Sequence, residues 1–131
     1  MRAAAQRLGR DTVRRSCPAT ILHQVLGLQA QLLSAAALGV RVRSTGLHAS
    51  DVNRALNDDR SIVRGWLMRG TLHVVAAEDF RWLVRLLGPV FVRASATRHA
   101  QLGLDDDVKT RGVAAIRKIL TDAGPIARYE L

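Results

Sequence analysis

The stretch "SIVRGWLMRGTLHVV", residues 61–75, decides the fold that we predict for this chain. Ile62 to Met68 and Thr71 to Val75 are two β-prone runs, and the Arg69-Gly70 dipeptide between them is able to turn a hairpin. Helical segments precede this ribbon, and the order helix, helix, helix, two-stranded ribbon is that of a winged-helix domain. We therefore predict a mainly α fold with a small β-ribbon, in which helices form the core and the ribbon forms the wing.

The start of the chain carries helix signals. We expect a first helix around Ala3 to Leu8, ended by Gly9. A second helix is capped by Ser16, has Pro18 in its first turn and continues at helical spacing up to Gly27.

Two more helices are expected before the ribbon. One runs from about Leu32 to Val40, ahead of a break at Gly46. The other lies within residues 48–59, where Ser50 is the expected cap and Asp51 complements the positive end of the helix dipole.

A long helix is expected after the ribbon, over residues 76–100. Acidic residues fill its first turn, and it bends at Gly88-Pro89 because proline removes a helix bond. One face carries Phe80, Leu83, Val84 and Leu87.

The C-terminal part is interpreted as the start of a second module. Residues 103–112 form a polar spacer, and a further helix begins at Ala127, four residues before the chain stops. We therefore expect the N-terminal portion of a longer protein, either a natural truncation or a fragment, with a winged-helix domain over 1–103 and a spacer and truncated second module over 104–131. The helix after the spacer has an in-phase apolar face, which could pair with another copy of the chain; its residues are Val113, Ile116, Ile119 and Leu120.

Composition agrees with a packed helical domain. The chain has 131 residues, 48% of them hydrophobic and 4% aromatic, so its core must consist of Leu, Val and Ala. The net charge is +9, and of the 20 basic residues only Lys109 and Lys118 are lysines. A bias toward GC-rich codons explains arginine over lysine but not the excess of base over acid. The charge therefore favours a polyanionic partner, most often nucleic acid.

Several classes of protein are disfavoured. Cys17 is the single cysteine, which excludes an internal disulfide and fits a reducing cytoplasm, and it has no evident activating neighbour beyond nearby arginines. No run approaches a membrane span or a signal peptide, so we expect a cytoplasmic, nucleoid-associated protein without membrane contact. His23, His48 and His99 show no metal-ligand spacing with one another or with the cysteine, and we expect no metal and no cofactor.

Two glutamines stand out inside an apolar run, "VLGLQAQLLSAAAL", residues 25–38. Residues i and i+2 lie on nearly opposite sides of a helix but on one side of an extended strand. If Gln29 and Gln31 hold one water, the chain near Ala30 must be non-helical, and Gly27 can supply the break. The alternative is that both amides bond the backbone at a helix junction, since a buried unpaired amide costs about 1 to 3 kcal/mol.

Four motifs resemble the AlkZ-like winged-helix DNA glycosylases and occur in the family's order and at similar spacing. They are "GLQAQ" (27–31), "VRGWLMRGTLH" (63–73), "AAEDFRWLVRLLGP" (76–89) and "GPIARYEL" (124–131). The resemblance covers essentially the whole chain but about the first third of a typical member, and it implies the first of several tandem winged-helix modules around a concave DNA-binding surface. Leu32-Leu33 departs from the helix-starting pair of many relatives.

The resemblance implies hydrolysis of the N-glycosidic bond of alkylated purines and, in some members, of crosslink adducts in DNA. It matches the family's catalytic Gln-x-Gln pair to Gln29 and Gln31. A glutamine amide has no useful proton affinity, so it can only orient a water. An N-alkylated purine carries positive charge and departs readily, so the absence of a carboxylate predicts action on cationic lesions and little on uracil.

Candidate DNA contacts lie on the ribbon and after the second helix of the core. We expect phosphate contacts from Arg64, Arg69, Thr71 and His73 on the ribbon and from Arg41 and Arg43, which alternate with valines and so share a face. The opposing interpretation makes these polar residues solvated and places Trp66, Leu72 and Val74 in the core.

Three functions remain open from the sequence. The first is a glycosylase acting on duplex DNA with an alkylated base. The second is a non-catalytic winged-helix DNA-binding protein, such as a transcriptional regulator. The third is an inactive truncated glycosylase.

Overall fold

The computed structural model describes residues 6, 8, 17–127 and 129. Contacts divide the chain into two units, Met1–Phe91 and Val92–Leu131, which we describe separately. The boundary lies between Phe91 and Val92, whereas the sequence places it at residue 103. The helix expected from Ala3 to Leu8 lies largely outside the described residues, as does Ser16; the described N-cap of the next helix is Cys17.

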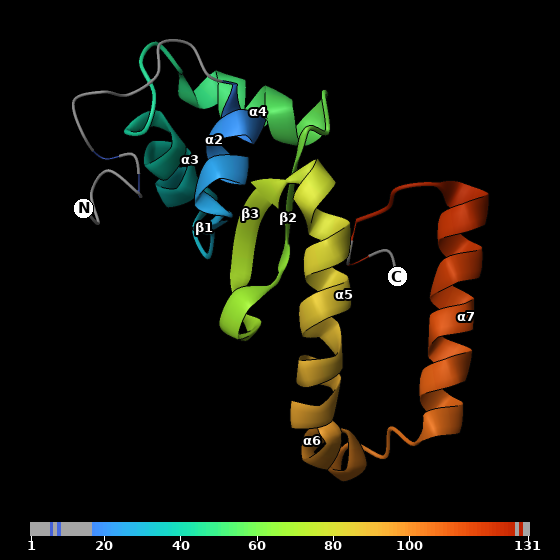
Figure 1. The fold of residues 1–131 in the computed structure, drawn as a ribbon. Helices are drawn as coiled ribbons and strands as arrows, with labels where there is room; N and C mark the ends of the chain where they lie inside the picture. Colours follow the sequence, from blue (N-terminus) through green and yellow to red (C-terminus); the bar gives the residue numbers. More distant parts are fainter. Residues whose placement is uncertain (1–5, 7, 9–16, 128, 130–131) are drawn as a thin grey trace. The chain divides into compact units, whose positions relative to one another are not determined.

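The first unit has the predicted order of helices and strands (Figure 1). Helices α2, α3 and α4 contact one another, and the β2–β3 hairpin projects from them. The elements are α2 (Pro18–Val25), β1 (Leu28–Gln29), α3 (Leu33–Arg41), α4 (Ala49–Asn57), β2 (Ile62–Trp66), a 3₁₀ turn (Met68–Gly70), β3 (Leu72–Ala76) and α5 (Ala77–Ala94). This confirms a mainly α fold with a small sheet, a winged-helix-like module.

The sheet has three antiparallel strands in the order β1-β3-β2. The predicted hairpin is confirmed: Arg69 and Gly70 turn it with φ of 56° and 65°. Strand β1 was not predicted, because two residues are too short to show alternation. Trp66 is 64% exposed at the end of β2, so its placement in the core is wrong, whereas Val74 is buried.

Two apolar clusters hold the first unit together. The larger lies between the helices and the sheet and consists mostly of small aliphatic residues, as the composition predicted; its buried members are Ile21, Leu22, Ala30, Ala36, Ala37, Val40, Val52, Ala55, Ile62 and Val74. The smaller joins the hairpin to α5 through Leu67, Val75 and Leu83, with Phe80 and Leu87 against them. Val84 is exposed, so its expected place on the packed face is wrong.

Helix α5 follows the hairpin along its length. A Cβ on Gly65 would lie 2.5 Å from the Phe80 ring, and one on Gly70 would lie 3.9 Å from the Phe91 ring. Pro89 lies inside α5, which continues to Ala94. Gly65 thus leaves room for the Phe80 ring against the sheet, whereas the distance at Gly70 is an ordinary van der Waals contact.

The cap of α4 differs from the prediction. His48 is the N-cap, and its N–H donates to Asp51 Oδ2 at 2.8 Å. Ser50 lies inside the first turn, so its expected role as cap is wrong. Asp51, three positions after the N-cap, accepts from the free His48 N–H and also pairs with Arg54 at 2.8 Å.

The second unit contains α6 (Ala96–Gln101) and α7 (Asp106–Ala123). The expected spacer over 103–112 is wrong from Asp106 onward, where α7 begins, and Asp105 caps this helix by accepting from the Val108 N–H at 2.8 Å. Pairs between Lys109 and Asp106 and between Arg111 and Asp107 support its first turns, so a charged sequence forms helix here.

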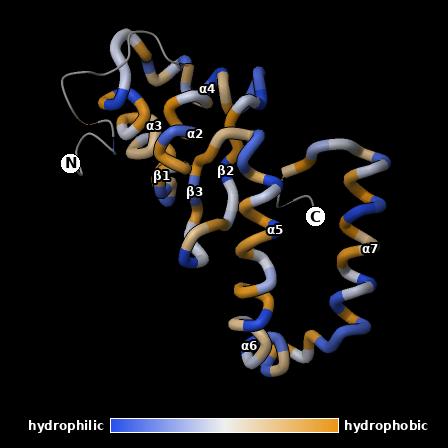
Figure 2. Tube along the Cα trace, viewed as in Figure 1, coloured by the Kyte–Doolittle hydropathy of each residue, from blue (hydrophilic) through white to orange (hydrophobic). Residues whose placement is uncertain are grey.

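The predicted apolar residues of α7 are all in the helix and exposed. Hydrophobic and hydrophilic positions alternate along α7 in Figure 2. The helix expected from Ala127 includes residues 128, 130 and 131, which are not among the described residues. Among the described residues, no helix is long and apolar enough to cross a membrane.

Candidate functional site

The two glutamines lie on an extended segment between α2 and α3. Gln29 ends β1, Gln31 lies in the bend that follows, and both side chains are exposed, while Ala30 between them is 0% exposed. The chain near Ala30 is therefore non-helical, as the spacing required. Alternation along this segment directs both amides away from the core.

Gly27 lets the chain leave α2 and enter β1. Its φ is +107°, and a Cβ there would lie 2.6 Å from Val75 Cγ1 and 2.9 Å from the Val74 carbonyl oxygen. Only glycine fits this approach without strain. The helix break expected at Gly27 is confirmed, since α2 ends at Val25.

Two neighbours fix the segment after Gln29. The Ala30 N–H donates to the Leu72 carbonyl at 2.7 Å, and the Leu72 N–H donates to Gln31 Oε1 at 3.0 Å. From β2, Arg64 Nε donates to the Ala30 carbonyl at 2.9 Å and Nη2 donates to the Gln31 carbonyl at 3.0 Å. Gln29, in contrast, has no side-chain hydrogen bond within the described part of the chain.

His73 stands directly across the sheet from Gln29. It is 5% exposed, and its Nδ1 lies 2.9 Å from the Thr71 carbonyl oxygen. Because a carbonyl only accepts, Nδ1 carries a proton. Gly65 on β2 is the other neighbour of His73 in this row.

The remaining candidate DNA contacts are placed unequally. Arg69 is exposed at the hairpin turn, and Thr71 donates its hydroxyl to the Met68 carbonyl at 3.2 Å. Arg41 is exposed, but Arg43 is 9% exposed and donates to the Gly39 carbonyl at 2.7 Å.

The shared face expected for the two arginines Arg41 and Arg43 is therefore wrong. Val42 between them has helical angles, φ −66° and ψ −11°, so the chain does not alternate there as a strand would. Arg43 Nε is buried and has no partner among the described residues.

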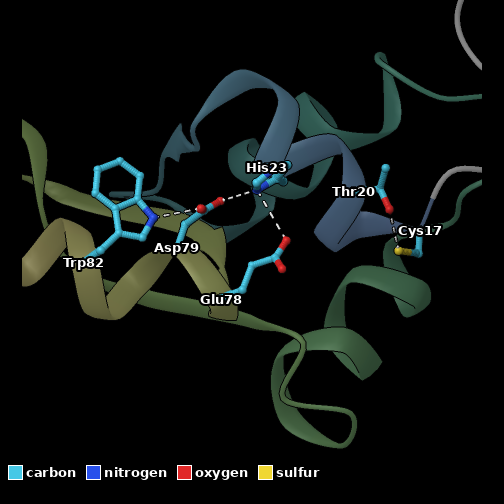
Figure 3. A network of polar contacts seen from close by, with 6 residues as sticks. All are labelled: Cys17, Thr20, His23, Glu78, Asp79 and Trp82. Atoms are coloured by element: carbon cyan, nitrogen blue, oxygen red, sulfur yellow. Dashed lines mark hydrogen bonds and ion pairs between the residues drawn. The ribbon is translucent and has the colours of Figure 1, made fainter.

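A polar cluster joins α2 to the start of α5 (Figure 3). His23 Nδ1 lies 2.8 Å from Asp79 Oδ2 and 3.3 Å from Glu78 Oε1, and Trp82 Nε1 donates to Asp79 Oδ1 at 2.9 Å. The hydrogen bond to Asp79, which is buried, raises the pKa of His23. A protonated His23 thus satisfies the carboxylate.

This cluster was missed from the sequence because His23 and Asp79 are 56 residues apart. The acidic first turn of α5 was the available signal. His23, Glu78 and Asp79 each offer a metal-ligand atom, and these atoms lie within 4.8 Å of one another. Because His23 pairs with both carboxylates, the three residues form an ion-pair network.

Cys17 has a neighbour that the sequence analysis did not identify. Its Sγ lies 3.1 Å from Thr20 Oγ1, and this hydrogen bond lowers the pKa of the thiol. The side chain is exposed at the start of α2. The thiol is therefore accessible. Cys17 lies at the N-terminal end of α2, whereas the glutamine pair follows the C-terminal end of that helix.

The fold and the exposed two-amide segment define a class: a small winged-helix-like module that presents polar side chains beside its hairpin. The chain belongs to the DNA glycosylase AlkZ-like family, whose sequence model matches residues 22–131. It is 31% identical over 103 residues to an interstrand DNA cross-link repair glycosylase of Streptomyces sahachiroi, a match that covers 73% of this chain and 26% of the relative.

A solved structure supports the same assignment. The DNA glycosylase AlkZ of Streptomyces sahachiroi superimposes with a TM-score of 0.51 at 33% identity, over 57% of this chain and 19% of that chain. The chain therefore spans about a quarter of the length of the curated relative that it matches, 26%.

Proposed function

We propose that this chain carries the base-excision centre of a DNA glycosylase, with Gln29 and Gln31 as the pair that holds the attacking water. The observation that carries the proposal is the placement of both amides on one extended, exposed segment on either side of buried Ala30. A helix would have separated them. The matched family supplies the reaction class, hydrolysis of an N-glycosidic bond.

The chemistry of amides limits the substrate. An amide orients water but takes no proton at neutral pH. The leaving group must therefore depart without strong base assistance, which a cationic N-alkylated purine does. The water oxygen bonds to C1′, the glycosidic bond breaks, its electron pair neutralises the purine, and the water proton passes to solvent.

Crosslink adducts fit the same requirement when they are formed by alkylation of a purine ring nitrogen. Each such adduct is a cationic leaving group. Because the curated relative is described as an interstrand cross-link repair glycosylase, we include these adducts in the proposed substrate class. The chain itself would act on duplex DNA in the cytoplasm, at the nucleoid.

The basic surface supports DNA binding. Net charge is +9, and Arg41 and Arg69 expose guanidinium groups beside the core and at the hairpin turn. Phosphate contacts release counterions, so binding should weaken with salt, with a slope of about 0.9 per contact. Salt-independent binding would exclude both a glycosylase and a non-catalytic DNA-binding protein.

A base-release assay separates the two DNA-binding functions. The duplex carries one N7-methylguanine, and release is followed by strand scission at the abasic site. Gln29→Ala combined with Gln31→Ala should abolish release and leave DNA affinity unchanged. Gln24→Ala, an exposed amide on α2, is the matched control. If the wild-type protein binds the duplex without releasing base, the proposed catalysis is wrong, and either of the two inactive alternatives fits.

A further inference from the structure

The amide of Gln31 has a fixed orientation. Its oxygen and nitrogen are hard to tell apart by shape, so the partner must decide which is which. The partner is the Leu72 N–H, which can only donate and which lies 3.0 Å away. The atom facing the sheet is therefore Oε1, and the NH₂ group of Gln31 faces away from Leu72.

The main chain of the same segment is held by Arg64. One guanidinium donates to two consecutive carbonyls, those of Ala30 and Gln31, at 2.9 and 3.0 Å. Strand β1 is only 2 residues long, so few ladder bonds hold the segment otherwise. A planar fork of donors suits this task, and a lysine ammonium does not.

Gln29 is in the opposite situation. Its side chain is exposed and has no hydrogen bond within the described residues. Its carbonyl oxygen is free to accept. Two amides on one segment thus differ: one has its oxygen engaged and the other has both ends available.

We propose that Arg64 is a positioning residue and that the two glutamines have unequal roles. Gln31 donates an N–H to the attacking water, and Gln29 accepts a hydrogen from the same water through its carbonyl oxygen. The second lone pair of the water then faces C1′. This inference rests on the proposed function and assigns the donor and the acceptor within it.

Paired substitutions test the two roles. Gln31→Glu keeps an oxygen for the Leu72 N–H but removes the donor, so single-turnover base release should fall by about tenfold or more, as expected for a lost hydrogen bond. Gln29→Glu keeps the acceptor, so release should equal or exceed that of the wild type. Equal losses in the two variants, or a larger loss for Gln29→Glu, would overturn the assignment.

Arg64 is tested by separating chemistry from binding. Arg64→Gln should slow single-turnover release at saturating protein by about tenfold while leaving the salt dependence of DNA affinity unchanged. Arg64→Lys should not restore the rate. Arg117→Gln removes the same charge from an exposed position on α7 and is the control. If Arg64→Gln instead lowers the salt slope by about 1 with an unchanged saturated rate, Arg64 is a phosphate ligand.

A measurement without DNA keeps this inference distinct from the proposed function. Hydrogen exchange of the Leu72 amide should accelerate in Gln31→Ala and in Arg64→Gln and stay slow in Gln31→Glu. Unchanged protection in all three variants would refute the positioning by Arg64 even if the wild type releases base. If the three variants show the expected protection pattern but the wild type releases no base, the proposed function and the water-holding roles are refuted. Only the positioning of the segment by Arg64 then remains.

Discussion

Replacing Gly27 by alanine should destabilise the first unit more than any other single methyl addition at a glycine that turns the chain. The φ of +107° strains a residue with a Cβ by about 1 to 2 kcal/mol. The new methyl would also lie 2.6 Å from Val75 Cγ1 and 2.9 Å from the Val74 carbonyl oxygen. That oxygen belongs to the central strand of the sheet and cannot move aside, so overpacking adds about 1 to 3 kcal/mol.

The sum of the two penalties is about 2 to 5 kcal/mol. At roughly 4 °C per kcal/mol for a domain of this size, the Tm should fall by about 8 °C or more. Both tryptophans, Trp66 and Trp82, lie in the first unit, so their fluorescence during urea or thermal unfolding reports on that unit.

Gly46→Ala is the matched control for this measurement. Gly46 has a φ of +84°, but nothing lies within 4 Å of the position of its Cβ. It should therefore lose only the backbone contribution, about 1 to 2 kcal/mol. If Gly27→Ala costs no more than Gly46→Ala, the close approach between the β1 entry and β3 is not as described.

Three further changes test other parts of the structure. Because the hydrogen bond to Asp79 raises the pKa of His23, the pair stabilises the fold fully below the usual histidine pKa of about 6.5, and this contribution is lost as pH rises through the raised value. The urea midpoint of the wild type should therefore approach that of His23→Gln at alkaline pH. Urea midpoints of the two proteins that differ equally at every pH would contradict the pair. Asp105→Ala removes the cap of α7 and should cost about 1 kcal/mol, read as faster hydrogen exchange in its first turn, with equal rates as the contrary result. Thr20→Val removes the hydrogen bond that lowers the pKa of Cys17, so disulfide-reagent labelling at neutral pH should slow; an unchanged rate would show that the bond is not formed in solution.

The order of elements could be predicted because the signals were local. Helical spacing up to Gly27 and the Arg69-Gly70 turn each depend on a few neighbouring residues. The extended conformation at Ala30 followed from the demand that two amides two positions apart face the same way. These predictions needed no knowledge of the tertiary structure.

What the sequence missed has a different cause, which is the influence of neighbours distant in sequence or of the helix itself. Arg64 was predicted as a phosphate contact on the ribbon, and nothing in the local pattern showed that its donors reach carbonyls more than 30 residues earlier. The bond between Leu72 and Gln31 spans 41 residues. No periodicity within a segment reports such contacts, and two-residue strands such as β1 leave no pattern at all.

Charge was misinterpreted at two places for a related reason. The run over 103–112 was taken as a spacer because it is polar, but charges spaced three and four apart pair along α7. Arg43 was expected to share an exposed face with Arg41 because both alternate with valines, but its guanidinium donates to the Gly39 carbonyl and is buried beside α3. Spacing on a helix therefore carries more information than polarity alone.

The proposed chemistry is tested most directly by comparing base release from two duplexes, one with a single N7-methylguanine and one with a single uracil, under single-turnover conditions. We predict release of N7-methylguanine but not of uracil, and loss of that release with retained DNA binding when Gln29 and Gln31 are both replaced by alanine. Release of uracil at a comparable rate, or release that survives the double substitution, would contradict the role of the two amides.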